Sequence, residues 1–190
     1  MSQIPACLPA DVPRVAAMSL WQAAKRYWSL RGAMGRVELA ADTVVVGRIL
    51  APGKGLVRVG AGVRLDASQA PILLMAFPGA EIVLGDGVVI ESGASIEAVS
   101  SVRIGARSRL GAFSMILDNS FHHLEGDRNV LPQSHPVVLE EDVLVGPRSI
   151  VLPGAHLGRG TRVGPCTVLS RRTPPGAVVA GHPAVIRMSA

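Results

Sequence analysis

Aliphatic residues recur at every sixth position over most of the second half of this 190-residue chain. From Leu84 the chain divides into segments of six residues that each open with Leu, Ile or Val, and the division resumes at Leu139 after an interruption. The opening residues are Leu84, Ile90, Ile96, Ile104, Leu110, Ile116, Leu139, Val145, Val151, Leu157, Val163 and Leu169. Neither the 3.6-residue helix period nor the two-residue strand period gives a strict six, so amphipathic helices and hairpins fit poorly.

Glycine often holds the second position of a segment, and a small or β-branched residue always holds the fifth. A period this short is typical of a β-solenoid, in which each segment supplies one short strand and one tight corner. Three segments make one triangular coil of 18 residues, so Leu139 should stack on Leu157. Leu84 should stack on Ile104 as well, although this coil contains two additional residues, Val102 and Arg103. Two earlier segments, over 59–70, predict one more coil, in which the six-residue repeat becomes irregular over 71–83.

The segment DNSFHHLEGDRNVLPQSHP, residues 118–136, interrupts the repeat. The next opening residue would be His122, which cannot serve as a buried aliphatic plug, so we expect a loop over 119–136 that leaves the wall. The expected organisation is therefore an N-terminal segment, a solenoid and a C-terminal tail, at 1–36, 37–172 and 173–190.

Aromatic and basic residues gather in the first part of the chain, where helical spacing predicts an amphipathic helix over 13–34. Its Trp21 and Trp28 favour packing against the rest of the protein. The alternative is peripheral contact with a membrane surface, since basic residues flank the aromatic ones.

Composition supports an aliphatic all-β domain, with 48% hydrophobic but only 3% aromatic residues, 21 Gly and 14 Pro. Cys7 and Cys166 have no metal or redox spacing, and the longest apolar run is too short to cross a bilayer, so we expect a cytoplasmic protein with reduced cysteines. The net charge is +5, but no Lys/Arg run is interleaved with aromatics, which argues against a nucleic-acid partner. A small-molecule ligand that carries phosphate groups would account for the positive net charge equally well.

A resemblance becomes clear in VGPRSIVLPGAHLGRGTRVGPCTVLSRRTPPGAVVAGHPAVI, residues 145–186, and in DNSFHH at the loop entrance. The chain resembles the hexapeptide-repeat acyltransferases, over roughly 55–187. Within that class it is similar to sugar and polysaccharide O-acetyltransferases related to the maltose, galactoside and xenobiotic acetyltransferases. The resemblance implies a left-handed parallel β-helix, a handedness that the repeat alone does not give. It also implies acetyl-CoA as co-substrate, no metal, and a homotrimer with active sites between subunits.

By the same resemblance, a loop histidine is the general base that takes the proton of an acceptor hydroxyl, and the acetyl group passes directly from the thioester. His122 matches that histidine. His123 follows it where the family often has proline, so His123 stays an alternative. Asp118 and Glu125 flank the pair and are candidates to orient the imidazole, the alternative being solvated loop carboxylates without such a role. We interpret His135, His156 and His182 as loop or corner residues.

The resemblance also assigns a coenzyme A groove, with backbone groups along the pantetheine arm and cations at the phosphates. The implied groove residues are Leu144, Pro147, Pro165, Ser170, Arg171 and Arg187. Arg172 lies beside Arg171 and is a further candidate cation. The basic residue that usually follows the "NPA" of the family is Val185 here, which predicts a rearranged phosphate contact.

The chain is thus expected to be an acetyl-CoA-dependent O-acetyltransferase of a sugar or glycoconjugate. Three alternatives stay open. An N-acetyltransferase of a nucleotide-linked amino sugar would use the same base and cofactor. A γ-carbonic-anhydrase-like enzyme would need three zinc-binding histidines, and an inert solenoid would only act as a scaffold. The identity of the acceptor does not follow from these residues.

Overall fold

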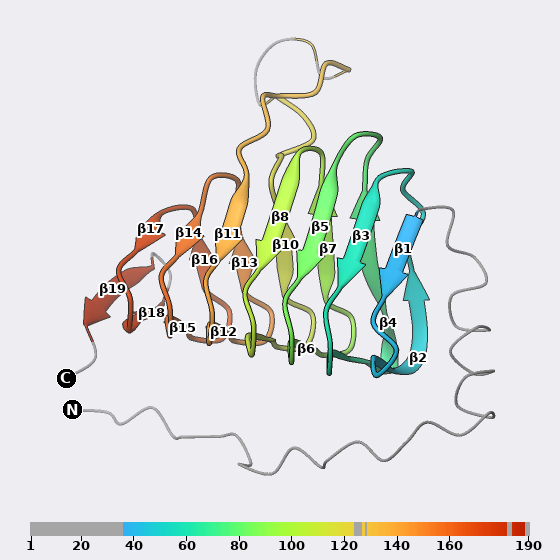
Figure 1. The fold of residues 1–190 in the computed structure, drawn as a ribbon. Helices are drawn as coiled ribbons and strands as arrows, with labels where there is room; N and C mark the ends of the chain where they lie inside the picture. Colours follow the sequence, from blue (N-terminus) through green and yellow to red (C-terminus); the bar gives the residue numbers. More distant parts are fainter. Residues whose placement is uncertain (1–35, 124–126, 128, 182–183, 189–190) are drawn as a thin grey trace.

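The computed structural model describes residues 36–123, 127, 129–181 and 184–188, and these form a three-sided solenoid of stacked parallel strands (Figure 1). The all-β solenoid that the repeat predicts is confirmed, and it agrees with a left-handed β-helix. The helix expected over 13–34 lies outside the described residues, as do Glu125 and His182.

The first face is a seven-stranded parallel sheet, so the solenoid has seven coils. Its strands, in spatial order, are β1 (Arg36–Leu39), β3 (Leu56–Val59), β5 (Glu81–Leu84), β8 (Ser101–Ile104), β11 (Val137–Leu139), β14 (His156–Leu157) and β17 (Arg172–Thr173).

The second and third faces share two long strands that bend from one face to the other, β2 (Val44–Leu50) and β4 (Arg64–Ala76). The second face continues through β6 (Val89–Ile90), β9 (Arg109–Leu110), β12 (Leu144–Val145), β15 (Arg162–Val163), β18 (Ala177–Ala180) and the antiparallel β19 (Val185–Met188). The third face continues through β7 (Ser95–Ala98), β10 (Met115–Leu117), β13 (Ile150–Val151) and β16 (Val168–Leu169).

The opening residues of the segments form the core, as the pattern predicts. All twelve are at most 2% exposed. The expected stacking is confirmed as well, because Leu84 pairs with Ile104, Ile104 with Leu139, and Leu139 with Leu157. Aliphatic side chains from successive coils therefore pack into one continuous interior, and their removal from water is the main stabilising contribution.

The solenoid reaches further in both directions than the clear repeat. Val59 pairs with Leu84 and Leu65 with Ile90, which confirms the earlier coil, and β1 and β2 form one coil more. At the other end, parallel pairing runs past residue 172 to β18, and only β19 turns back.

The corners require a left-handed backbone at the fourth position of most segments. From Leu84 onwards, ten such residues have φ between 53° and 78°, a region that residues other than glycine rarely adopt. They are Gly87, Gly93, Arg107, Phe113, Asp142, Arg148, Gly154, Gly160, Cys166 and Gly176. Five of the ten are not glycine, so the stacked coils stabilise a conformation that these residues would avoid in isolation.

Where the second position is glycine, the reason is the close approach of the next coil. A Cβ on Gly146 would lie 2.7 Å from the backbone carbon of Gly164, whereas a Cβ on Gly164 would first meet the Ala180 methyl group at 3.3 Å. Among the described residues, no helix is long and apolar enough to span a membrane.

These two glycines give a matched test of coil spacing. We expect Gly146→Ala to destabilise the protein by about 1–3 kcal/mol, because backbone atoms of a stacked coil cannot move aside locally. Gly164→Ala should have a clearly smaller effect. Urea unfolding followed by circular dichroism measures both, and equal effects would contradict the steric explanation.

Candidate active site

The break in the repeat is a loop that projects from the solenoid between β10 and β11, at the edge where the third face meets the first (Figure 1). It carries both candidate catalytic histidines. The strands on either side keep their register, since β11 pairs with β8 below it and β14 above it. The loop is therefore an insertion at one corner that leaves the wall intact.

Asp118, a candidate to orient the imidazole, has other partners. Its side chain is fully buried, and its carboxylate accepts hydrogen bonds from the backbone amides of Val99 (2.8 Å), Ser100 (2.7 Å) and Ser101 (2.7 Å). Within the described residues, none of its hydrogen bonds goes to His122 or His123. Asp118 therefore fixes the start of the loop to the coil below, and its role in orienting the imidazole stays a prediction.

The two irregularities of the repeat lie at the same corner. The extra residues before Ile104 widen the corner at 99–101, and the loop begins directly above it, at Asp118. Three amides at that corner point to one carboxylate. Because a buried amide without an acceptor costs about 1–3 kcal/mol, the widened corner and Asp118 depend on each other.

The exit of the loop is also fixed by backbone hydrogen bonds. The His135 amide donates to the Asp118 carbonyl (2.8 Å), and the Gly154 amide donates to the His135 carbonyl (2.9 Å). His135 itself is exposed, which agrees with its interpretation as a loop residue.

His122 and His123 are both exposed beyond this fixed base. Phe121, just before them, has a φ of 62°, and its ring packs against Phe77 with centroids 5.7 Å apart. An aromatic contact to the wall thus holds the residue that precedes the pair, while the imidazoles stay open to solvent. This arrangement suits a base that must reach an external substrate.

His156 has a structural environment on the first face. Its Nε2 lies 2.8 Å from Oε1 of Glu140, and its Nδ1 lies 3.0 Å from the Arg172 guanidinium. Because the guanidinium only donates, Nδ1 accepts and Nε2 carries the proton. Two hydrogen bonds lower the pKa of Glu140: the one from His156 contributes most, and the one from the Arg159 amide comes second.

The candidate coenzyme A residues fall at three places on one chain. Leu144 and Arg187 share the second face; Pro147 and Pro165 are stacked at the corner between the second and third faces. Ser170 and Arg171 lie at the corner that leads from β16 to β17. Pro147, Pro165, Ser170, Arg171 and Arg187 are exposed and Leu144 is half-buried.

The strand register reveals one feature that the sequence reading missed. Outward positions on the second face form a row in which aliphatic residues and arginines alternate: Val44, Arg64, Val89, Arg109, Leu144, Arg162, Val178 and Arg187. The signal was available, since each residue from Arg64 to Val178 directly precedes a buried residue of that face.

The arginines of this row differ in their partners. Arg64 pairs with Asp66 at 2.7 Å, and Arg109 lies 3.6 Å from Glu91. Arg162 and Arg187 are exposed, and in the part of the chain that the structure describes neither has an ion-pair partner. The uncompensated positive charge of the row therefore lies at its C-terminal end.

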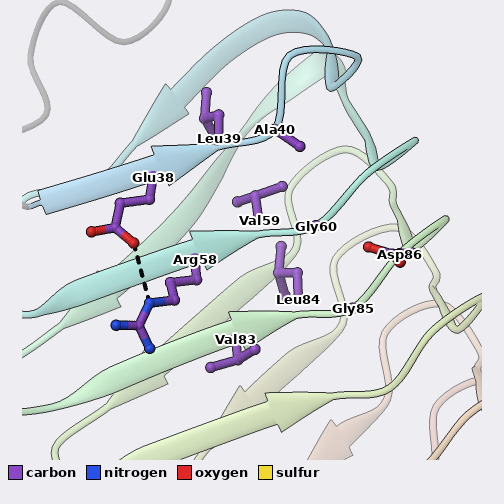
Figure 2. A pocket seen from close by; sticks show the side chains of 10 residues that line it. All are labelled: Glu38, Leu39, Ala40, Arg58, Val59, Gly60, Val83, Leu84, Gly85 and Asp86. Carbon is purple, nitrogen blue, oxygen red and sulfur yellow. Dashed lines mark hydrogen bonds and ion pairs between the residues drawn. The ribbon is translucent and has the colours of Figure 1, made fainter.

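A shallow depression of about 540 Å³ lies elsewhere, at the ends of β1, β3 and β5. Figure 2 shows Glu38 and Arg58 bridged across it, with Asp86 at its edge. None of the candidate site residues lines it. Among the described residues, no cluster of His, Cys, Asp or Glu is arranged to hold a metal ion.

Comparison with known proteins supports the class of protein that the repeat and fold define. Residues 136–171 match the family described as bacterial transferase hexapeptide (six repeats). A 2,3,4,5-tetrahydropyridine-2,6-dicarboxylate N-acetyltransferase of Staphylococcus aureus is 40% identical over 55 residues, which is 29% of this chain. The match spans only 23% of the length of that relative.

Solved structures share the fold along nearly the whole chain. A hexapeptide-repeat acetyltransferase of Vibrio cholerae, complexed with acetyl-coenzyme A, aligns with a TM-score of 0.56 and 19% identity over 91% of this chain and 80% of its own. A polysialic acid O-acetyltransferase aligns with a TM-score of 0.57 and 17% identity over 81% and 84%. Residues 136–171 thus carry the hexapeptide repeat of bacterial transferases, and the chain shares the β-helix fold of these solved structures.

Proposed function

We propose that this protein is an acetyl-CoA-dependent O-acetyltransferase that acts on a hydroxyl of a sugar or glycoconjugate, with His122 as general base. The observation that carries the proposal is the histidine pair on a firmly anchored loop at a corner where the six-residue repeat is interrupted. The fold is shared with a transferase that binds acetyl-coenzyme A and with one that acetylates the oxygen of a polysaccharide.

The proposed reaction is a direct transfer. The unprotonated ring nitrogen of His122 takes the proton of the acceptor hydroxyl as its oxygen attacks the thioester carbonyl. The tetrahedral intermediate then expels the coenzyme A thiolate, which receives the proton from the imidazolium. A histidine suits both steps because its pKa lies near neutral pH.

Replacement of the base tests the core of the proposal. We expect His122→Ala to lower kcat by about 10²- to 10⁴-fold, as is usual for loss of a general base. Coenzyme A binding, measured by calorimetry, should stay close to that of the parent because the imidazole acts on the acceptor. His123→Ala is the matched control, and a full loss in His123→Ala with an active His122→Ala would reverse the assignment.

The type of acceptor is tested directly by mass spectrometry of the products. The purified protein is incubated with acetyl-CoA and either neutral and acidic oligosaccharides or nucleotide-linked amino sugars. Acetylation that a mild base removes identifies an ester and supports the proposal. A stable amide on an amino sugar would favour N-acetyl transfer, the reaction of the Staphylococcus aureus relative.

We propose that coenzyme A runs along the second face and its corner with the third, past Leu144, Pro147 and Pro165. Two exposed arginines of the alternating row, Arg162 and Arg187, would hold its phosphates. Supporting this are their shared row, their exposure and their uncompensated charge at the C-terminal end. Ser170 and Arg171 lie on another corner, so they would face a neighbouring subunit rather than the same stretch of groove.

A charge-removing variant tests the phosphate contact. We expect Arg162→Gln to raise the KM for acetyl-CoA about five-fold, as for loss of an exposed ion pair of roughly 1 kcal/mol, with little change in kcat. The KM for acetyl-pantetheine, which lacks the nucleotide, should not change. Arg48→Gln, an exposed arginine of the opposite end, is the control, and equal effects in both variants would contradict the assignment.

We also propose a homotrimer in which the third face meets a neighbouring subunit. The outward row of that face is mostly apolar: Leu73, Ser95, Met115, Ile150 and Val168. Met115 is 37% exposed, which is unfavourable on a surface left in water. The histidine loop leaves from the edge of this face, so a subunit packed there would lie beside His122 and complete the site.

Disruption of the apolar row tests this assembly. We expect Ile150→Asp to yield a folded but inactive monomer, because a carboxylate would be buried without a partner in the interface. Val138→Asp changes an equally half-buried position on the first face and should leave the trimer intact. Light scattering gives the mass, and a fully active parent monomer would exclude the proposed assembly.

A further inference from the structure

Asn119, next to the anchored Asp118, is fully buried at the base of the loop. Its Oδ1 accepts a hydrogen bond from the Phe121 amide (2.6 Å), and its Nδ2 donates to the Pro132 carbonyl (2.7 Å) and the Ser134 hydroxyl (2.8 Å). The opposite orientation of the amide would place its oxygen against the Pro132 carbonyl oxygen. These contacts therefore determine the positions of Oδ1 and Nδ2 of Asn119.

These bonds connect the two arms of the loop. Phe121 belongs to the entry arm, and Pro132 and Ser134 belong to the exit arm. Asp118 joins the loop to the coil below, whereas the side chain of Asn119 holds one arm against the other. Because Asn119 is buried, its bonds are made where water does not compete, and they fix the separation of the arms.

The bond to Phe121 acts on the backbone directly before the histidine pair. Phe121 adopts a left-handed conformation, with φ of 62°, which a phenylalanine leaves unless its surroundings hold it there. Asn119 binds its amide and Phe77 packs on its ring. The direction in which the chain enters His122 therefore depends on Asn119.

We propose that Asn119 is the positioning residue of the active site: it clamps the two arms of the loop and aims the His122 imidazole without touching substrate. The inference rests on the proposed function. It assigns to a buried amide the orienting task that the sequence suggested for Asp118.

Asn119→Asp is the primary test, because aspartate keeps the size and the acceptor for Phe121 but places an oxygen opposite the Pro132 carbonyl. We expect kcat to fall about 10- to 100-fold, since a displacement of about 1 Å in a catalytic group costs about two orders of magnitude. The KM for acetyl-CoA should be unchanged. Asn129→Asp, an exposed asparagine of the same loop, should retain the parent kcat.

A double-mutant cycle separates positioning from general stability. In the His122→Ala background, Asn119→Asp should lower the residual rate by less than two-fold, because there is no base left to aim. A full, additive loss in that background, or a parent-like kcat in the single variant, would overturn the inference.

Two further measurements keep the inference testable if Asn119→Asp folds poorly or the parent transfers no acetyl group. Ser134→Ala removes one of the clamp bonds and should lower kcat a few-fold with an unchanged melting temperature. Hydrogen exchange of the peptide over 119–136 should be faster in Asn119→Ala than in Asn129→Ala, whether or not the parent is active. An inactive parent with faster exchange would reject the proposed function alone, and unchanged exchange would reject the clamp.

Discussion

The parallel backbone ladder between successive coils is the constraint on which the rest of the structure depends. Each coil accepts and donates hydrogen bonds to its neighbours at a fixed spacing, about 4.8 Å in β-sheets. The ladder places equivalent positions of successive coils above one another. The aliphatic residue that opens a segment, such as Leu139, must therefore lie between its counterparts Ile104 and Leu157. It also brings backbones so close at Gly146 that a methyl group has no room. The six-residue repeat is the sequence record of this ladder.

Such a ladder tolerates an insertion only if the freed backbone groups find other partners. At the corner over 99–101 three amides have no place in the regular pattern, and the carboxylate of Asp118 accepts all three. Asn119 then binds both arms of the loop that follows. Two adjacent buried polar side chains thus absorb the irregularities of two coils, and the loop leaves a rigid base.

The interior of the solenoid was predictable because the ladder turns one-dimensional spacing directly into contact. The openers, the stacking of Leu84 on Ile104 and the loop at the histidines all follow from counting residues. The hydrogen bonds of Asp118 could not be predicted in this way, because a carboxylate near a histidine suggests an electrostatic partner. The backbone amides that it binds become apparent only from the widened corner. The candidate coenzyme A residues came from resemblance, and their distribution over a face and two corners depends on which strand or corner each occupies.

Outward positions are free of the ladder, and this freedom allows each face its own surface chemistry. The first face carries ion pairs such as Arg103 with Glu81, the second alternates aliphatic residues with arginines, and the third is largely apolar. None of these choices alters the core, because side chains of alternate residues point away from it. A solenoid can therefore keep one interior while each of its faces has a different surface chemistry. The histidine loop leaves from the edge between the first and third faces, so in the trimer that we propose it lies beside the neighbouring subunit.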